Sequence, residues 1–270
     1  LKNDDLKNVF NGKFKAVFHF AALKAAGESM LEPGKYATSN ITGTINILNK
    51  MLENNIKYFI FSSTAAVYGM PEYLPVDEKH PINPINFYGY TKLEIENLLH
   101  WYSNLKGIRF GALRYFNAAG YDMQGRIKGL EKNPANLLPV VMESAIGIRD
   151  TMDIYGDDYN TPDGTGIRDY IHVNDLAIAH VRALNYIVEK QENLTLNLAT
   201  GKGYSVLEVI KNIQEIIGKN INYKIIDRRP GDPAELIAVS NLANDKLNWE
   251  CKYSDINAIL QSMWNVYSNQ

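Results

Sequence analysis

The first 117 residues alternate between short apolar segments and longer amphipathic ones, and this alternation constrains the fold more than any other feature. Residues 15–20, 57–62 and 108–114 are short and apolar, which is typical of buried strands. Two stretches of helical periodicity separate them, at residues 36–54 and 90–104. Strands that alternate with helices form a parallel sheet covered on both faces. The pattern therefore predicts an α/β protein with a doubly wound, Rossmann-type parallel sheet.

The second half of the chain has longer connections rich in Gly, Asp, Asn and Pro. We expect residues 1–117 to form a dinucleotide-binding domain. Residues 118–270 should form mainly a smaller α/β substrate-binding region, with some elements returning to the first domain. No Gly-rich turn opens the sequence at Leu1, although such a turn normally binds the cofactor pyrophosphate. We therefore expect one or two βαβ units, about 60 residues, to be missing before Leu1. Predicted helices of this half lie at residues 137–148, 174–188, 205–217 and 254–267, and strands at 195–198 and 222–226.

Charge and cysteine content argue against several classes of protein. The net charge of -2 gives no sign of a surface for nucleic acid or for an anionic membrane. No apolar run reaches the roughly 18 residues that a membrane span needs. The single cysteine, Cys251, cannot form an intrachain disulfide, which fits a reducing compartment. We expect a cytoplasmic protein with no metal, because no His, Cys or Asp cluster has the spacing of metal ligands.

Tyr88 and Lys92 are candidate catalytic residues near the start of the second predicted helix. They lie about one helical turn apart, so their side chains share a face. The ammonium can lower the pKa of the phenol from about 10 by stabilising the phenolate. A phenol with a pKa near neutrality is an effective base. The same spacing recurs within or at the end of amphipathic helices, where we interpret it as a solvated helix face: Tyr102/Lys106 and Tyr186/Lys190.

Hydroxyl side chains follow the second predicted strand, as Ser62, Ser63 and Thr64. The carboxyl ends of parallel strands are where catalytic groups emerge. A hydroxyl there can orient or relay a substrate proton beside the phenol. For Ser62 and Ser63, capping of the following turn is an equally good interpretation. We therefore predict Thr64 as the third catalytic residue, with Tyr88 and Lys92.

The segments around these residues resemble a known family. Residues 62–69 read Ser-Ser-Thr-Ala-Ala-Val-Tyr-Gly, and residues 88–92 read Tyr-Gly-Tyr-Thr-Lys. They resemble the extended short-chain dehydrogenase/reductases and, more narrowly, the UDP-glucose 4-epimerases among the nucleotide-sugar epimerases. The block at residues 163–172 is highly specific. Further matching segments lie at residues 20–25, 40–44, 113–117 and 228–232, so the resemblance covers nearly the whole chain.

The resemblance implies an isomerase that oxidises C4 of UDP-glucose or UDP-galactose with bound NAD and then re-reduces it on the opposite face. Related 4,6-dehydratases carry an Asp-Glu pair directly after the catalytic Thr. Here Ala65 and Ala66 stand there, and methyl groups cannot transfer protons. Two alternatives stay open: another UDP-sugar epimerase or a decarboxylase of the same scaffold, and an inactive truncated binding protein.

The resemblance also implies ligand positions. Those for NAD are Phe20, Ala21, Ala22, Leu23, Lys24, Asn40, Thr64, Tyr88, Lys92, Tyr115 and Phe116. Those for the UDP-sugar are Lys24, Ala25, Thr64, Tyr88, Asn117, Asn136, Leu137, Tyr155, Arg168, Arg229, Asp232 and Leu236. Tyr155 would stack on uracil and Asp232 would bind the uridine ribose. Arg168 and Arg229 would bind the diphosphate, because guanidinium presents forked donors.

Two more expectations come with the resemblance. Leu236 matches a gate beside the C2 substituent of the sugar, where a bulky Tyr excludes N-acetylated sugars, so activity on UDP-GlcNAc and UDP-GalNAc stays open. Family members commonly form homodimers through a four-helix bundle. The helices predicted at residues 36–54 and 90–104 would supply it.

Overall fold

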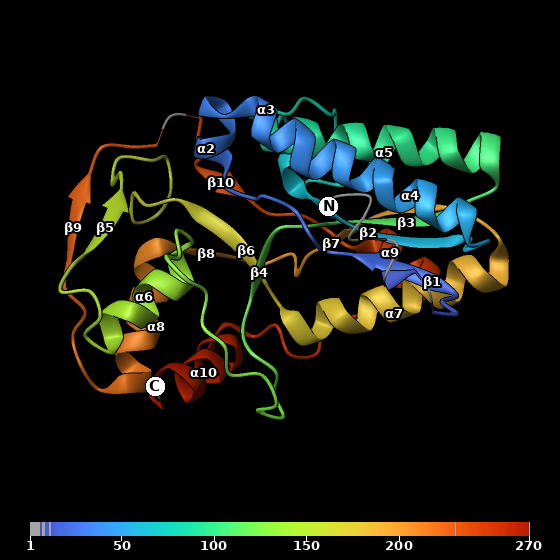
Figure 1. Cartoon of the computed structure of the whole chain (residues 1–270). Helices are drawn as coiled ribbons and strands as arrows, with labels where there is room; N and C mark the ends of the chain where they lie inside the picture. Colours follow the sequence, from blue (N-terminus) through green and yellow to red (C-terminus); the bar gives the residue numbers. More distant parts are fainter. Residues whose placement is uncertain (1–5, 7–8, 11, 230, 270) are drawn as a thin grey trace.

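Four parallel strands form the main sheet of the molecule (Figure 1). The computed structural model describes residues 6, 9, 10, 12–229 and 231–269, so Leu1 and Pro230, which belong to segments discussed above, lie outside the described residues. The strand order is β1-β2-β3-β7, and every neighbouring pair is parallel. The predicted Rossmann-type α/β fold is confirmed. The strands are β1 (Ala16–His19), β2 (Tyr58–Thr64), β3 (Arg109–Tyr115) and β7 (Leu194–Leu198).

Helices cover both faces of this sheet. α4 (Gly43–Glu53) and α5 (Phe87–Lys106) lie on one face, and α7 (Val173–Lys190) lies on the other (Figure 1). Alternate residues of a strand point to opposite faces. Accordingly, Phe59 of β2 packs in the core under α4 and α5, whereas Ile60 packs in the core under α7.

The helical stretch predicted at residues 36–54 is a continuous run of three segments. α3 (Pro33–Tyr36) leads into a π-helical segment, η1 (Ala37–Thr42), which leads into α4. Short π-helical segments are rare and often occur at functional sites. Asn40 lies in this segment and is buried. The short helix α2 (Ala26–Leu31), which precedes this run, was not predicted.

α5 begins at Phe87, three residues before the predicted start. Asn86 caps it, because its side-chain oxygen accepts a hydrogen bond from the Gly89 N–H at 2.8 Å. The helix ends at Gly107, which adopts a φ of 73° that few residues other than glycine tolerate. The earlier start places Tyr88 in the first turn of α5.

A second layer of strands lies beside the main sheet. β6 (Ile167–His172) lies between β4 (Asn117–Ala119) and β10 (Glu235–Leu236), and β8 (Gly203–Ser205) pairs with it antiparallel. β7 belongs to the main sheet, and helix α9 (Asn241–Leu247) packs on β7 and α7, so part of the second half of the chain joins the first. The remaining elements are β5 (Met152–Tyr155), paired with β9 (Tyr223–Ile226), and the helices α6 (Leu137–Ala145), α8 (Val206–Ile217) and α10 (Ile256–Tyr267).

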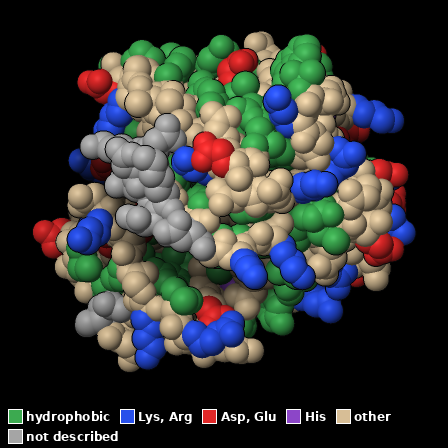
Figure 2. All heavy atoms as spheres, turned by 45° about the vertical axis from the view of Figure 1, so that its right-hand side comes forward, with side chains coloured by type: hydrophobic (Ala, Val, Ile, Leu, Met, Phe, Trp, Pro, Cys, Tyr) green, Lys and Arg blue, Asp and Glu red, His purple; other side chains and the backbone are tan. Residues whose placement is uncertain are grey.

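Charged side chains of both signs are distributed among apolar ones on the face that Figure 2 shows, in keeping with the small net charge. Within the part of the chain that the structure describes, no helix is both long enough and apolar enough to span a membrane. Buried apolar side chains of the helices pack in cores against the strands. The core beneath α6, α8 and α10 is separate from the two that cover the main sheet.

Candidate active site

The structure brings the three predicted catalytic residues together where β2 ends and α5 begins. Thr64 is the last residue of β2, and its hydroxyl accepts a hydrogen bond from the Ala66 N–H at 3.2 Å. The Tyr88 phenol interacts with Thr64 through a side-chain hydrogen bond. The Lys92 ammonium lies 5.9 Å from the centroid of the Tyr88 ring. A hydroxyl, a phenol and an ammonium therefore surround one point at the carboxyl edge of the sheet.

A close backbone contact holds the first turn of α5 at this edge. A Cβ on Gly89 would lie 2.5 Å from the carbonyl oxygen of Ala66, closer than real side chains approach. Glycine is therefore required for the helix to come this near to the turn after β2. The Tyr88 N–H donates a hydrogen bond to Ser29 Oγ at 3.0 Å, which ties the same turn to α2.

Lys92 is 2 % exposed, and its ammonium donates a hydrogen bond to the carbonyl oxygen of Ser62 at 2.8 Å. The ammonium also lies 4.7 Å from the centroid of the Phe61 ring. Burial lowers the pKa of Lys92 to about 8, because it removes water from the charged form, and Glu96 partly opposes this shift. Among the described residues, the bond to Ser62 is the one hydrogen bond that Lys92 donates, so two of its three N–H groups can serve a ligand.

The predicted lowering of the pKa of Tyr88 by Lys92 stays a prediction for the protein with NAD bound. Burial raises the pKa of the Tyr88 phenol to about 12, and the hydrogen bond with Thr64 only partly offsets it. Lys92 does not counter this effect because its ammonium is directed to the Ser62 carbonyl. A positive charge placed against the phenol would favour the phenolate.

Aromatic side chains lie at the ends of the strands next to β2. Phe20 follows β1 and is 57 % exposed, and its ring centroid lies 4.8 Å from that of His180. Tyr115 ends β3, and its phenol forms a hydrogen bond with Ser62 Oγ. Phe116 packs against the core cluster that contains Val67. The predicted cofactor positions on these strands therefore share one edge of the sheet.

Asn40 holds the loop after β1 in place. Its Oδ1 accepts a hydrogen bond from the Leu23 N–H at 2.9 Å, and its Nδ2 donates to the Leu23 carbonyl and to Thr91 Oγ1. Both amide donors are thus used within the protein. Asn40 therefore positions the segment that contains Ala21, Ala22 and Leu23, and the predicted contact of Asn40 with the cofactor stays a prediction.

The predicted substrate-binding charges lie near β6 and β10. Arg168 Nη2 forms an ion pair with Asp232 Oδ1 at 2.5 Å, and Arg168 is opposite Leu236 in the register of the two strands. The Arg229 guanidinium lies 3.7 Å from the centroid of the Tyr155 ring. These predicted residues therefore contact one another in two pairs, and Arg229 covers the ring face that was predicted to stack on uracil.

The other predicted substrate positions are more widely spread. Lys24 forms an exposed ion pair with Glu131 at 2.7 Å. Asn117 donates a hydrogen bond from Nδ2 to the Asp169 carbonyl at 3.0 Å, which attaches β4 to β6. The last three lie at helix starts: Ala25 directly before α2, exposed Asn136 at the N-cap of α6 and Leu137 at its first helical residue.

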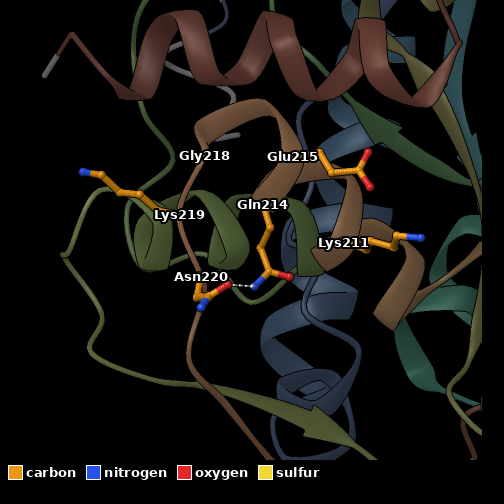
Figure 3. Close-up of a pocket in the computed structure, with 6 residues that line it drawn as sticks. All are labelled: Lys211, Gln214, Glu215, Gly218, Lys219 and Asn220. Carbon is orange, nitrogen blue, oxygen red and sulfur yellow. Dashed lines mark hydrogen bonds between the residues drawn. The ribbon is translucent and has the colours of Figure 1, made fainter.

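Two hollows lie in the surface, one away from the carboxyl edge of the main sheet and one beside it. One, of about 390 Å³, lies at the C-terminal end of α8, and its charged side chains diverge into solvent (Figure 3). None of the predicted site residues lines it. The second, of about 400 Å³, lies beside the first turn of α5 and is lined by Ser29 and Tyr90 among others. Within the described part of the chain, no cluster of His, Cys, Asp or Glu could hold a metal ion.

Comparison with known proteins identifies the family. Residues 1–199 match the family described as NAD dependent epimerase/dehydratase. The chain belongs to this family. It is 45% identical over 249 residues to the UDP-glucose 4-epimerase of Halalkalibacterium halodurans, covering 92% of this chain and 75% of the relative.

Solved structures of the family have the same fold. The UDP-glucose 4-epimerase from Brucella ovis in complex with NAD aligns with a TM-score of 0.92 and 41% identity, over 98% of this chain and 81% of that one. The UDP-glucose 4-epimerase from Bifidobacterium longum in complex with NAD+ and UDP aligns with a TM-score of 0.89 and 39% identity, over 99% of this chain and 81% of that one.

Within an epimerase/dehydratase family, the residues after Thr64 bear on the reaction. Ala65 and Ala66 form the short 3-10 turn η2 (Ala65–Val67), and Ala65 is buried. Neither side chain can donate or accept a proton. The only titratable group that contacts the Thr64 hydroxyl among the described residues is Tyr88.

One feature beneath the site was not predicted, the buried ion pair of Glu96 and Arg114. Arg114 Nη2 lies 2.5 Å from Glu96 Oε2, and both residues are almost fully buried. The signal in the sequence was present, because Glu96 is four residues after Lys92 on α5 and Arg114 interrupts an apolar strand. Opposite charges at two buried positions suggest a pair.

Proposed function

We propose that this protein is a UDP-glucose 4-epimerase, an isomerase that interconverts UDP-glucose and UDP-galactose with NAD as its resident cofactor. The observation that carries the proposal is the contact of Tyr88 with Thr64 beside buried Lys92, followed by two alanines instead of acidic residues. The curated relative and the two solved structures described above bear this name, which supports the same activity here.

The residues at the strand ends fit a nicotinamide nucleotide. Phe20 presents an exposed ring, and Lys92 keeps two N–H donors that can reach ribose hydroxyls. We infer that the loop of residues 20–24, together with Lys92, Tyr115 and Phe116, holds the cofactor. Asn40 fixes that loop from behind. When bound, oxidised NAD supplies a reversible hydride acceptor and a positive charge that favours the Tyr88 phenolate.

Tyr88 acts as the base for the sugar 4-hydroxyl, and the same phenol returns the proton when C4 is reduced. Thr64 orients that hydroxyl, directly or by relaying its proton, since it is within hydrogen-bonding reach of the phenol. Lys92 keeps its ammonium at the site by its bond to the Ser62 carbonyl. Because Ala65 and Ala66 carry no acid or base, elimination of water from the sugar has no proton donor there.

The second half of the chain, residues 118–270, binds the UDP portion, while residues 1–117 hold the cofactor. Arg168 and Arg229 bind the diphosphate, and Asp232 binds the ribose. Both arginines contact other side chains of the protein, so substrate binding exchanges the Asp232 ion pair and the Tyr155 contact for contacts with the ligand. We infer that Asn117, Asn136 and Leu137 contribute to the same site, together with Lys24 and Ala25.

The proposal also covers the location of the protein and its oligomeric state. We infer that the protein is cytoplasmic and forms a homodimer through the helices α4 and α5 of each subunit. Support for the dimer comes from Trp101 and Leu105, two large apolar residues of α5 that are 63% and 68% exposed. They lie one helical turn apart and so share a face.

Product analysis tests the function. Incubation with UDP-galactose and NAD should produce UDP-glucose, seen by ¹H NMR as a change in the coupling of H4 of the sugar. UDP-glucuronate and UDP-pentoses, each incubated with the protein in a separate assay, test the other activities of this scaffold. Turnover of those sugars without conversion of UDP-galactose would replace the proposal with a decarboxylase or a pentose epimerase. No turnover of any UDP-sugar would favour a binding protein.

A further inference from the structure

Helix α5 is attached to the end of β2 by contacts along one face. The helix residues that make them are spaced three and four apart, so they lie on one side of α5. Each contact reaches a residue within two positions of Thr64. The pairs are Gly89 with the Ala66 carbonyl, Lys92 with the Ser62 carbonyl and Glu96 with the Ser63 hydroxyl.

The contact of Ser63 with Glu96 is the most constrained of these. Ser63 Oγ donates a hydrogen bond of 2.5 Å to Glu96 Oε1. Arg114 holds the same carboxylate with two bonds, from Nε at 3.0 Å and from Nη2 at 2.5 Å. A two-point bond from a guanidinium fixes the orientation of a carboxylate. Because Glu96 cannot rotate, its bond to Ser63 fixes the position of the strand relative to the helix.

The turn after Thr64 is attached to the same ion pair. Arg114 Nη1 donates a hydrogen bond to the Tyr68 hydroxyl at 3.0 Å, and Tyr68 donates to Asn197 Oδ1 at 2.6 Å. Thr64 therefore lies between two segments that one buried ion pair holds in place. Ser63 is directly before it, and Tyr68 closes the turn behind it.

We propose that Ser63 is a positioning residue, whose hydroxyl sets the Thr64 hydroxyl against the Tyr88 phenol by joining β2 to the Glu96–Arg114 pair. The proposal rests on the proposed epimerase function for its kinetic consequence. Ser63 is 2 % exposed, and its hydroxyl is directed to Glu96. Its removal should impair the reacting step and leave substrate binding intact, because the UDP-binding residues near β6 and β10 are elsewhere.

The kinetic test uses Ser63→Ala and Ser63→Thr in the complete protein. Ser63→Ala leaves the ion pair intact and removes only its link to β2. We expect kcat to fall by about 10- to 100-fold, the scale of a small misplacement of reacting groups, with KM for UDP-galactose unchanged. Ser63→Thr keeps a hydroxyl and should recover most of kcat. An unchanged kcat in folded Ser63→Ala, or an equally low kcat in Ser63→Thr, would overturn the proposal.

Ser103→Ala is the matched control. Ser103 is a buried serine of the same helix, and its hydroxyl accepts a hydrogen bond from Asn193 Nδ2 at 2.7 Å. It lies 15 residues after Tyr88, about 22 Å along the helix. Its loss should lower the melting temperature and leave kcat unchanged. A fall in kcat as large as that of Ser63→Ala would show a general effect of lost packing and refute the positioning role.

A second measurement needs no substrate and so separates this proposal from the proposed function. In protein labelled with ¹³C at the tyrosine ring, the Cζ signal of Tyr88, assigned by its loss in Tyr88→Phe, reports the hydrogen bond to Thr64. The signal should shift in Ser63→Ala and return in Ser63→Thr. An unshifted signal would refute the positioning role even in an active epimerase. A shifted signal in a protein that epimerises no UDP-sugar would leave the positioning role standing and reject the function.

Discussion

At the scale of single residues, the site is a compromise between burial and charge. Lys92 and Tyr88 are both held in surroundings that disfavour their ionised forms, so the pKa of the lysine falls and that of the tyrosine rises. The chemistry proposed for the site requires the opposite for Tyr88. Such opposed demands are common at functional sites, where stability is lost for activity.

Tyr88→Phe should lower kcat for UDP-galactose by about 100- to 10,000-fold, because it removes the proposed base and leaves the ring in place. Binding of UDP-sugar, measured by calorimetry, should persist. Tyr102→Phe is the matched control, since Tyr102 lies on the same helix, precedes a lysine at the same spacing and bonds to Asn49 at 2.9 Å. Near-normal turnover in Tyr88→Phe would contradict the mechanism.

Lys92→Met should stabilise the protein at pH 7 while lowering its activity. The pKa of Lys92 falls from 10.5 to about 8 on folding, a cost of about 3 kcal/mol in the protonated form. The unfolded chain binds more protons than the folded one between these two values, so this cost is relieved as pH rises through that range. Urea unfolding at pH 7 and pH 10 should give a stability gain that is larger at pH 7. A gain that grows with pH would contradict this assignment.

Leu236 is the proposed gate for substituents at C2 of the sugar. It is half-buried, packs against the cluster of Val67, Tyr68 and Ala238, and lies opposite Arg168 in the strand register. Leu236→Tyr should reduce turnover of UDP-GlcNAc at least tenfold relative to UDP-glucose. Parallel coupled assays of both sugars measure this ratio. If the ratio is the same in both proteins, Leu236 is not the gate.

At the scale of elements, α5 is the part of the molecule on which the site depends. It carries Tyr88 and Lys92, and it approaches β2 only as closely as Gly89 allows. The helix could be predicted from its periodicity, but its start could not. That start depends on Asn86 acting as a cap, in a segment whose Pro and Asn content indicates a loop.

Gly89→Ala should separate α5 from the turn after β2. The new methyl group would lie 2.5 Å from a backbone oxygen, so the helix must shift, at a cost of about 1–3 kcal/mol. Both the melting temperature and kcat should fall. Gly34→Ala is the control, because nothing lies within 4 Å of the added carbon and alanine favours the helix. If Gly89→Ala keeps wild-type kcat, close approach of α5 is not needed for activity.

β6 shows why hydrophobic periodicity does not predict strands that contain polar residues. Its sequence, Ile-Arg-Asp-Tyr-Ile-His, looks too polar for a core strand. Asp169 is nevertheless fully buried, because it accepts hydrogen bonds from the N–H groups of Thr200 and Gly201 and from the Thr200 hydroxyl. Hydrogen-bond partners some 30 residues away in the chain allow the Asp169 carboxylate to be buried. Hydrophobic periodicity within a short stretch of sequence contains no information about such partners.

At the scale of the whole molecule, α4 and α5 cover one face of the main sheet (Figure 1). α5 also exposes two large apolar side chains, Trp101 and Leu105. Trp101→Glu should therefore convert the proposed dimer to a monomer, measured by size-exclusion chromatography with light scattering. Val181→Glu is the control, since Val181 is 54% exposed on α7, the helix on the opposite face. A wild-type protein that is monomeric at micromolar concentration would remove the dimer from the proposal.

The sequence by itself determined the Rossmann-type fold and supplied Tyr88, Lys92 and Thr64 as candidate catalytic residues, because both depend on patterns within short stretches of chain. Strand and helix periodicity are properties of short windows, and Tyr88 and Lys92 share a face through one turn of helix. Tertiary structure alone decided the direction of the Lys92 ammonium, the raised pKa of Tyr88 and the inward use of Asn40. It also brought Glu96 to Arg114 and Ser63. Each of these depends on burial or on a partner distant in the chain, and the free energy of a charge or a hydrogen bond depends on that environment.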